Sequence, residues 1–345
     1  MSGGLDSSAT ALILKNQGFE VIGLTLQFFE NNLSSAGNDF SDNIKDINSA
    51  RKFADLIDIP HFIVDVNKHF KQTIIDDFIL QYKTGFTPNP CAKCNPEIKW
   101  KYLYEISQKL DCEFIATGHY ANIKEKNRRY FLNLPDDKTK DQSMFLWKLP
   151  QKILKKAIFP LSAYSKDEIR KMMSKNGYNF ITERRESFNL CFIKKMSNHD
   201  FLKKHIKNVE QGQVFSSSGK YLGVHNGYFY YTIGQKVENI DMNLRVRKII
   251  AETNTIIVDN AENIITNELI IDNINLMKYK ELQDGFSVNA KIKYRENGNN
   301  CKIFNFENKL KLIFENYIPK PAVGQSVVLF EGNDMLGGGI ITNTN

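Results

Sequence analysis

Strand-like and helix-like segments alternate over the first two hundred residues, and this alternation constrains the fold more than any other feature. Apolar runs of strand length occupy residues 20–28, 61–66 and 113–117. Apolar residues recur at helical spacing over residues 44–57, 70–82 and 98–106. Strands that alternate with helices predict a parallel sheet covered by helices on both faces. Ser165 and Glu168 further predict a capping box at the start of a helix.

The pattern changes near residue 205. From Gly212 onward the sequence has short strand-like runs, many glycines and few helical stripes. The clearest of these runs are 288–294, 301–306, 311–314 and 326–330. Short strands separated by turns predict a small α+β central domain followed by a C-terminal β-barrel. We therefore expect domains at residues 1–203, 204–268 and 269–345.

The first seven residues contain two adjacent glycines, two serines and one carboxylate, directly before an apolar helical run that begins near Ser8. Glycine lets the backbone approach an anion closely, and a helix N-terminus carries partial positive charge. Ser2 and Ser7 can donate hydrogen bonds to phosphate oxygens, and Asp6 can hold Mg²⁺ against them. The loop is a candidate phosphate cradle. The alternative is a solvated turn that caps the helix, since short glycine motifs are weak signals.

The composition limits the classes of protein to which this chain can belong. The chain has 345 residues, of which 42% are hydrophobic and 25% charged, as in ordinary globular proteins. The sequence has no apolar run of membrane-spanning length and no signal peptide, so we expect a cytoplasmic protein with no membrane partner. Its five cysteines then favour functional thiols in a reducing compartment over a disulfide framework. The net charge of +7 permits an RNA partner without requiring one.

Two cysteines, Cys91 and Cys94, lie three positions apart just before a helical stripe. The pair is compatible with a redox dithiol, with half of a zinc site, or with unrelated thiols. Zinc would need a second ligand pair, which the sequence does not offer. Cys191 lies in an apolar, strand-like run, which favours a buried core cysteine. Cys112 and Cys301 lie in strand patterns and are predicted to be packing residues.

The first loop resembles the PP-loop of ATP pyrophosphatases, Ser-Gly-Gly-x-Asp-Ser, and it lacks the Gly-Lys-Ser/Thr ending of a Walker A loop. Enzymes with a PP-loop split ATP into AMP and pyrophosphate and use the AMP to activate an oxygen as a leaving group. A PP-loop normally follows a buried strand, whereas this loop begins at Met1. We therefore expect that the working protein is longer, with a short apolar strand encoded upstream of Met1.

Together with further motifs, this loop resembles the tRNA-specific 2-thiouridylases over nearly the whole chain. The further motifs are Thr-Pro-Asn-Pro-Cys-x-x-Cys-Asn at 87–95 with Ile-Lys-Trp at 98–100, Ala-Thr-Gly-His-Tyr-Ala at 116–121, Lys-Asp-Gln-Ser-x-Phe-Leu at 140–146, Cys-Phe-Ile at 191–193, Gly-Lys-x-Leu-Gly-x-His at 219–225, Tyr-Thr-Ile-Gly-Gln at 231–235 and Gly-Gly-Gly at 337–339. Each motif alone is weak, but their order and spacing are specific. The two family thiols fall at Cys94 and Cys191.

The resemblance implies a PP-loop α/β domain, a small central domain and a C-terminal β-barrel. It implies replacement of the C2 oxygen by sulfur in the wobble uridine, position 34, of the tRNAs for lysine, glutamate and glutamine. The implied products are 2-thiouridine, AMP and pyrophosphate. ATP with Mg²⁺ would adenylate the oxygen, and a cysteine persulfide would supply the sulfur. A sulfur-carrier protein or cysteine desulfurase is the implied donor, and we expect a monomer.

The resemblance also assigns residues to these roles. The nucleotide would contact Met1, Ser2, Gly3, Gly4, Leu5, Asp6, Ser7, Leu26 and Gly118. Cys191 would carry the persulfide, and Cys94 would attack it and form a transient Cys94–Cys191 disulfide. Both thiol roles need accessible thiolates. The tRNA would contact Asn89, Pro90, Cys91, His119, Lys140, Asp141, Gln142, Lys293, Tyr294 and Gln325.

Two positions depart from the family pattern. Many relatives carry an aspartate, a candidate general acid or base, where this chain has Cys91. This difference keeps open a site in which Cys91, Cys94 and Cys191 ligate an iron–sulfur cluster. Lys293 stands where an arginine is usual, which keeps the positive charge but loses the bidentate fork toward phosphate.

Two other functions compete with tRNA thiolation. One is a PP-loop ligase or amidotransferase that acts on a small metabolite, although such an enzyme has no use for paired thiols or a C-terminal barrel. The other is a non-catalytic RNA-binding or cluster-carrying protein, which a PP-loop domain without its first strand would favour. Transfer of radiolabelled sulfur separates the first from a thiouridylase, and ATP–pyrophosphate exchange separates the second.

Overall fold

The structure is a computed structural model that describes residues 1–29, 41–183, 190–193, 196–207 and 209–344. The chain divides into two compact units that are built from interleaved segments. The first unit contains residues 1–73, 92–188 and 333–335, and the second contains 74–91, 189–332 and 336–345. Each unit has an apolar core of its own.

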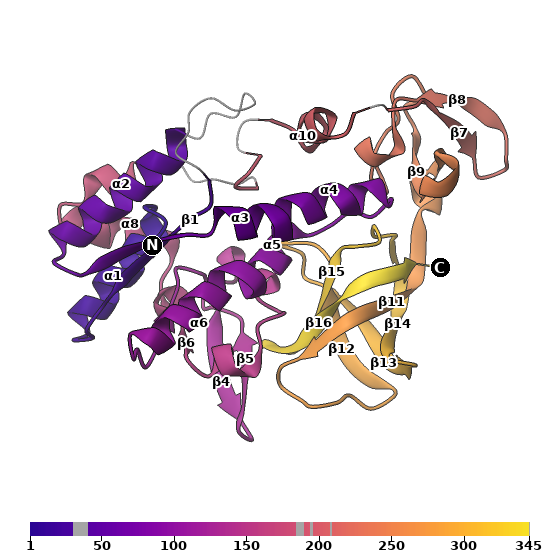
Figure 1. Cartoon of the computed structure of the whole chain (residues 1–345). Coiled ribbons are helices and arrows are strands. Elements are labelled where there is room, and N and C mark those ends of the chain that lie inside the picture. The colour runs from indigo at the N-terminus through magenta and orange to yellow at the C-terminus, as the bar shows by residue number, and fades with distance from the viewer. Residues whose placement is uncertain (30–40, 184–189, 194–195, 208, 345) are drawn as a thin grey trace. The chain divides into compact units, whose positions relative to one another are not determined.

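The first unit combines short strands with helices (Figure 1). Its strands are β1 (Gly23–Gln27), β2 (His61–Asp65), β3 (Ile115–Ala116), β4 (Asn122–Lys126), β5 (Arg129–Asn133) and β6 (Ala157–Ile158). Strand β1 pairs with β2 and β3 pairs with β6, both in parallel, whereas β4 and β5 form an antiparallel hairpin. The predicted parallel pairing is confirmed, but among the described residues it forms two separate two-stranded pieces instead of one continuous sheet.

The helices of the first unit surround these strands. They are α1 (Leu5–Asn16), α2 (Ser41–Leu56), α3 (Asn67–Phe70), α6 (Trp100–Lys109), α7 (Gln151–Leu154), α8 (Lys166–Lys175) and α9 (Asn179–Thr182). Short 3₁₀ turns lie at η3 (Lys138–Lys140), η4 (Ser143–Phe145) and η5 (Pro160–Ala163). Two segments cross the boundary between the units or adjoin it, namely the π-helix η1 (Lys71–Ile75) and the pair α5 (Pro90–Cys94) and η2 (Asn95–Lys99).

Helix α1 lies in the middle of the first core. Its apolar residues pack with those of α2, α8 and α9, among them Leu12, Phe53 and Ile169. Figure 1 shows α1 in the same part of the chain as α2 and α8. The helix is buried throughout residues 8–14, whereas Asp6 and Ser7 in its first turn are partly exposed. The packing therefore holds the helix rigidly and leaves its N-terminal end accessible.

The predicted helix start at Ser165 is confirmed as the N-cap of α8. The Ser165 hydroxyl accepts a hydrogen bond from the Glu168 N–H at 3.3 Å, and the Glu168 carboxylate accepts from the Ser165 N–H at 2.7 Å. This capping box fixes Lys166 as the first residue of the helix. Ser197 and Asp200 form the same motif at the start of α10 (Asn198–His205) in the second unit.

The second unit contains α4 (Asp76–Lys83), α10 and a four-stranded sheet in the order β8-β7-β10-β9. The strands are β7 (Gly212–Ser216), β8 (Tyr221–His225), β9 (Leu244–Ile250) and β10 (Thr255–Asn260), with 3₁₀ turns at η6 (Tyr228–Tyr230), η7 (Ala251–Thr253) and η8 (Ala261–Asn263). A turn at Gly219 joins β7 to β8. Val214, Val246 and Ile256 form the small core of this sheet.

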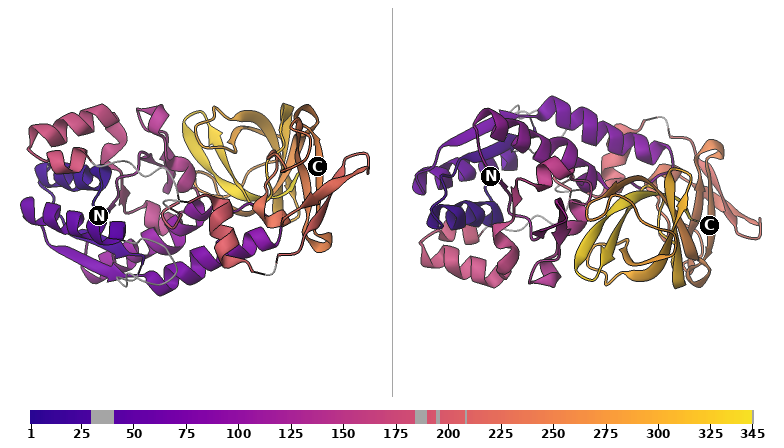
Figure 2. Two further views of the ribbon diagram at one scale, coloured as in Figure 1. Left: turned by 90° about the horizontal axis from the view of Figure 1, so that it is seen from above. Right: turned by 90° about the horizontal axis from the view of Figure 1, so that it is seen from below.

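A closed β-barrel completes the second unit (Figures 1 and 2). Its strands are β11 (Ile265–Leu276), β12 (Phe286–Lys291), β13 (Asn299–Phe306), β14 (Lys309–Pro319), β15 (Ser326–Glu331) and β16 (Asp334–Thr344). They follow the order β11-β14-β13-β12-β15-β16, and β16 pairs back with β11. Ile271, Ile303 and Leu312 are fully buried in the barrel core. The predicted C-terminal barrel is confirmed.

Three expectations stay predictions at this level: the limits of the three domains, the monomeric state, and the strand upstream of Met1. Within the described residues, no helix is both long and apolar enough to cross a membrane.

Candidate active site

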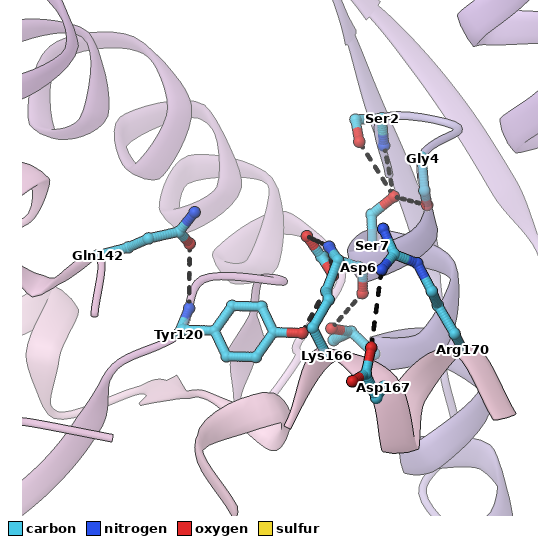
Figure 3. A network of polar contacts seen from close by, with 10 residues as sticks. Ser2, Gly4, Asp6, Ser7, Tyr120, Gln142, Lys166, Asp167 and Arg170 are labelled. Atoms are coloured by element: carbon cyan, nitrogen blue, oxygen red, sulfur yellow. Dashed lines mark hydrogen bonds and ion pairs between the residues drawn. The ribbon is translucent and has the colours of Figure 1, made fainter. Parts of the chain in front are cut away.

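The loop before α1 is closed by hydrogen bonds around Ser7 (Figure 3). The Ser2 N–H donates to the Ser7 hydroxyl at 3.0 Å, the two hydroxyl oxygens lie 3.1 Å apart, and the Ser7 hydroxyl donates to the Gly4 carbonyl at 3.1 Å. Gly4 is the N-cap of α1 and provides no side-chain cap. A helix start of this kind directs backbone N–H groups toward an anion.

The two glycines of the loop serve different purposes. Gly3 has a φ of +69°, and a β-carbon there would lie 2.1 Å from the backbone oxygen of Asp46 in α2. The Ser49 hydroxyl donates to the Gly3 carbonyl at 3.2 Å, so α2 holds the loop closely. At Gly4 a β-carbon would meet only the Ser2 hydroxyl, at 3.5 Å. Gly3 is therefore needed by the fold, whereas the space at Gly4 is open to a ligand.

The Asp6 carboxylate points toward Lys166 at the start of α8 (Figure 3). The Lys166 Nζ lies 2.6 and 2.7 Å from the two carboxylate oxygens, and the Tyr120 hydroxyl donates to one of them at 3.3 Å. The Lys166 side chain is only 8% exposed, whereas that of Asp6 is 29% exposed. Sequence reasoning did not identify Lys166 or Tyr120. The capping box predicts that α8 begins at Lys166, but it does not predict a contact with Asp6, which is distant in the sequence.

A second segment lies directly against the loop. Gly118 follows β3, and a β-carbon there would approach the backbone and side chain of Asp6 at 2.8–2.9 Å. Gln142 holds this segment from the other side, because its N–H donates to the Tyr120 carbonyl at 2.8 Å and its side-chain oxygen accepts from the Tyr120 N–H at 3.1 Å. The structure thus brings two predicted nucleotide positions, Asp6 and Gly118, into contact.

The remaining predicted nucleotide positions lie on or beside β1. The Met1 amino group donates to the Leu24 carbonyl, and the Thr25 hydroxyl donates to the Met1 carbonyl at 2.7 Å. Leu26 is the next-to-last residue of β1 and is half-buried. These contacts tie the beginning of the loop to the strand that follows α1.

Four of the predicted tRNA contacts belong to the first unit. His119 is half-buried, with Nδ1 2.9 Å from the Thr117 hydroxyl. Burial and then the nearby Lys99 charge lower the pKa of His119 to about 3, so that the imidazole is neutral at pH 7. Asp141 accepts a hydrogen bond from the Ser143 N–H at 2.9 Å, and Lys140 and Gln142 are partly exposed.

Gln325, in the second unit, holds the loop that precedes the Cys91 and Cys94 pair. Its side-chain amide donates to the carbonyls of Thr87 at 2.7 Å and Pro88 at 3.3 Å, and the Thr87 N–H donates to the Val323 carbonyl at 2.8 Å. The predicted base contacts Asn89 and Cys91 are partly exposed, and Pro90 is buried. Gln325 therefore fixes the backbone that leads to these positions.

Lys293 and Tyr294 lie in an exposed turn after β12. The Glu296 carboxylate accepts a hydrogen bond from the Lys293 N–H at 2.8 Å, which tightens the turn. The Arg295 guanidinium lies 5.1 Å from the centre of the Tyr294 ring. Two exposed cations beside an exposed aromatic ring suit a nucleic acid, since phosphates attract cations and bases stack on rings. Sequence reasoning did not include Arg295, although its position beside the Lys-Tyr pair was a usable signal.

The thiols differ in exposure from what the sequence predicted. Cys191 is exposed and lies in a turn, in which the Ile193 N–H donates to the Leu190 carbonyl at 2.9 Å. The prediction of a buried core cysteine in a strand is therefore wrong. The apolar character of this segment belongs to Phe192 and Ile193, which are buried in its place. The Phe192 ring packs at 5.2 Å from Phe78 and 5.4 Å from Phe201, so an aromatic cluster anchors the turn beside the thiol.

Cys94, at the end of α5, is buried and only 6% exposed, whereas Cys91 is half-buried. The expectation of an accessible Cys94 thiol is not met in this structure. Cys301 is buried in β13, and burial raises its pKa to about 12, which confirms a packing role. Cys112 precedes β3 and is half-buried, so its assignment to a strand is wrong.

In the described part of the chain the five cysteines form no disulfide, and no group of three or more His, Cys, Asp or Glu side chains is arranged to hold a metal ion. The iron–sulfur alternative stays a prediction.

The fold and the loop define a PP-loop protein with an appended β-barrel, and comparison with known proteins narrows this class. Residues 1–195 match the family model for the tRNA methyl transferase HUP domain, 199–260 that for the tRNA methyl transferase PRC-barrel domain, and 266–341 that for the aminomethyltransferase beta-barrel domain. These ranges follow the order of domains expected from the sequence.

Curated relatives match over nearly their whole length. The tRNA-specific 2-thiouridylase MnmA of Salinibacter ruber is 40% identical, and the match covers 99% of this chain and 92% of the relative. The proteins of the same name from Amoebophilus asiaticus and Cytophaga hutchinsonii are 35% and 34% identical, covering 99% and 100% of this chain and 93% and 96% of theirs. The chain belongs to the family of tRNA-specific 2-thiouridylases, which are tRNA sulfurtransferases.

Among solved structures, the NMN synthetase from Francisella tularensis aligns with a TM-score of 0.34 and 13% identity, over 58% of this chain and 68% of its own. This likeness is too weak to carry an argument about fold or function.

Proposed function

We propose that this protein adenylates the C2 oxygen of the wobble uridine, position 34, in the tRNAs for lysine, glutamate and glutamine, and replaces that oxygen with sulfur. One observation carries the proposal: an open glycine loop at the accessible end of a buried helix occurs in the same chain as the exposed thiol of Cys191. Membership in the thiouridylase family supports tRNA as the substrate. We place the reaction in the cytoplasm, where thiols stay reduced.

The loop residues fit ATP and Mg²⁺. The Ser2 hydroxyl and the N–H groups of the first turn of α1 are donors for phosphate oxygens, and the space at Gly4 is open. The Ser7 hydroxyl would exchange its hydrogen bond to the Gly4 carbonyl for one to a phosphate oxygen. The partly exposed Asp6 carboxylate is the kind of oxygen ligand that Mg²⁺ prefers. We assign residues 1–7 to the phosphates and the metal, and Leu26 and Gly118 to the adenosine.

ATP makes an oxygen that leaves poorly into one that leaves readily. The C2 oxygen of the uridine bonds to the α-phosphorus, and pyrophosphate departs. Sulfur then adds at C2, the carbon–oxygen bond breaks, and the original oxygen leaves as part of AMP. The wobble base must first turn out of the anticodon stack, at a cost of a few kcal/mol. Asn89, Pro90 and Cys91 are the residues to which we assign contacts with this base.

We propose that Cys191 carries the sulfur as a persulfide, which a sulfur-carrier protein or cysteine desulfurase can load because the thiol is exposed. In one route the Cys94 thiolate attacks the Cys191 sulfur and expels hydrosulfide, which attacks C2. In the other, the terminal sulfur attacks C2 directly, and Cys94 then breaks the bond between this sulfur and Cys191. Both routes end in a Cys94–Cys191 disulfide. Two external thiol groups then reduce this disulfide back to the two cysteine thiols.

Cys94 must become accessible during this cycle, because it is only 6% exposed. Movement of the segment around α5 on tRNA binding would uncover it. Cys91, in the same short helix, is more exposed but stands where relatives carry an acid or base. We propose that proton transfer in this protein does not depend on the Cys91 side chain, since a thiol replaces a carboxylate only weakly in that role.

We assign contacts with the tRNA to the exposed turn of Lys293 and Tyr294, with Arg295 as a further cation, and to His119, Lys140 and Asp141 in the first unit. Gln142 and Gln325 would contribute to tRNA binding indirectly, because they hold the backbone of segments that contact the tRNA. A neutral His119 can donate or accept a hydrogen bond but adds no charge at pH 7.

The test is sulfur transfer to unmodified tRNA transcripts by the purified protein with ATP, Mg²⁺ and a radiolabelled persulfide donor. Label should enter the transcripts for lysine, glutamate and glutamine. It should not enter the same transcripts with cytidine at position 34, or any transcript when ATP is omitted. Consumption of ATP without transfer to any tRNA would favour the small-metabolite ligase instead.

A further inference from the structure

Lys166 is a buried lysine whose ammonium contacts both oxygens of the PP-loop carboxylate Asp6, at 2.6 and 2.7 Å. We propose that Lys166 is a positioning residue of the ATP site: it holds the Asp6 carboxylate in place and supplies positive charge on which nucleotide binding depends. This inference rests on the proposed function, since it deepens the assignment of the loop to ATP.

The position of Lys166 in α8 is unfavourable for the helix itself. The first residue of a helix lies at the positive end of the helix dipole, where cations are disfavoured. The helix start is already satisfied by the capping box of Ser165 and Glu168, so the lysine is not needed to begin α8. Burial of its side chain to 8% exposure adds a desolvation cost that only a close counter-charge offsets. The contact with the Asp6 carboxylate supplies that counter-charge.

Tyr120 completes the arrangement around the carboxylate (Figure 3). Its hydroxyl donates to Asp6 at 3.3 Å, and the Lys166 Nζ lies 5.8 Å from the centre of its ring. Tyr120 is itself only 2% exposed and is held at its backbone by Gln142. The carboxylate is thus oriented by two rigid neighbours, while its partly exposed side remains available to a metal ion.

Lys166 and a divalent cation would share the Asp6 carboxylate. The lysine is therefore predicted to change metal binding and phosphate binding in opposite directions. A cation beside Asp6 weakens the binding of a metal ion alone, because the carboxylate is already compensated. The same cation strengthens the binding of phosphates, which carry negative charge into the site. If the lysine only stabilised the fold, its removal would not change metal binding and phosphate binding in opposite directions.

The experiment compares the wild type with Lys166→Gln, which keeps a hydrogen-bond donor but removes the charge, and with Lys166→Arg, which keeps the charge. ATP binding is measured by calorimetry in EDTA, and Mn²⁺ binding without nucleotide by electron paramagnetic resonance. We expect Lys166→Gln to bind ATP at least about tenfold more weakly, because the Asp6 carboxylate, no longer compensated, repels the phosphates. It should bind Mn²⁺ several-fold more tightly, and Lys166→Arg should stay close to the wild type in ATP binding.

Lys278 provides the matched control in the barrel. It is also buried, with 5% side-chain exposure, and its ammonium lies 2.5 Å from the Glu331 carboxylate. Lys278→Gln should lower the melting temperature but leave both binding constants unchanged. If Lys166→Gln does not fold, Lys166→Met replaces it, since that variant buries no unpaired amide.

Two results would overturn the inference. One is ATP binding by Lys166→Gln that equals the wild type. The other is a parallel weakening of ATP and Mn²⁺ binding, which would mean that the lysine only supports the fold. A wild type that binds ATP neither in EDTA nor with Mg²⁺ would refute the proposed function and this inference with it, so the two failures are distinguishable.

Discussion

At the scale of single residues, Gly3 shows how the fold constrains the loop. Its φ of +69° and the 2.1 Å distance that would separate a β-carbon from the Asp46 backbone oxygen both exclude a side chain. We predict that Gly3→Ala lowers the free energy of unfolding by more than about 2 kcal/mol. Gly18→Ala is the matched control, since Gly18 also has a positive φ, +88°, but has open space around it, and should lose only about 1 kcal/mol. Urea denaturation measures both, and equal losses would contradict the steric argument.

The exposure of Cys191 leads to a prediction about sulfur. Cys191→Ser should abolish thiolation and leave tRNA affinity within a few-fold, because it removes the sulfur carrier without touching the loops assigned to RNA. In Cys94→Ser a persulfide should accumulate on Cys191, and intact-protein mass spectrometry detects it as one added sulfur. Cys112→Ser, which alters a half-buried thiol with no assigned role, should behave as the wild type. Normal 2-thiouridine formation by Cys191→Ser would remove this residue from the mechanism.

At the scale of elements, the start of α8 should respond to pH. The N–H of Ser165, and then its hydroxyl, hold the pKa of Glu168 below its ordinary value of 4.5. The unfolded chain therefore takes up this proton at a higher pH than the folded protein does. The stabilisation is complete above the unfolded pKa and is lost as pH falls through the folded pKa. The difference in melting temperature between the wild type and Glu168→Gln should thus shrink between pH 6 and about pH 3. A difference that stays constant over this range would show that the capping box does not depend on charge.

Elements defined by a local pattern were predictable from the sequence. Apolar runs of strand length gave β1 and β2, and the capping box gave the start of α8. Elements defined by distant partners were not predictable. The segment of Cys191 has the composition of a strand, but its neighbour Phe192 packs into an aromatic cluster instead of a sheet. The contact of Lys166 with Asp6 spans most of the first unit in sequence, and no local pattern records it.

At the scale of the whole molecule, the chain does not fold as a simple succession of segments. Helix α4 comes early in the sequence, yet Phe78 packs at 5.9 Å from Phe201, and the Lys83 carbonyl accepts a hydrogen bond from the Tyr228 hydroxyl at 2.5 Å. These contacts place it in the second unit. Sequence patterns reveal where elements begin and end, but not which distant elements they join, so the interleaving of the two units was not predicted.

The central claim is that one activation by ATP precedes one transfer of sulfur to the wobble uridine. The most direct test is a single-turnover reaction of persulfide-loaded protein with ATP, Mg²⁺ and the lysine tRNA transcript, followed by mass spectrometry of the nucleosides and measurement of AMP. We predict equal amounts of AMP and 2-thiouridine at position 34, and neither product with Asp6→Asn. Formation of 2-thiouridine without ATP, or of AMP without 2-thiouridine, would contradict the claim.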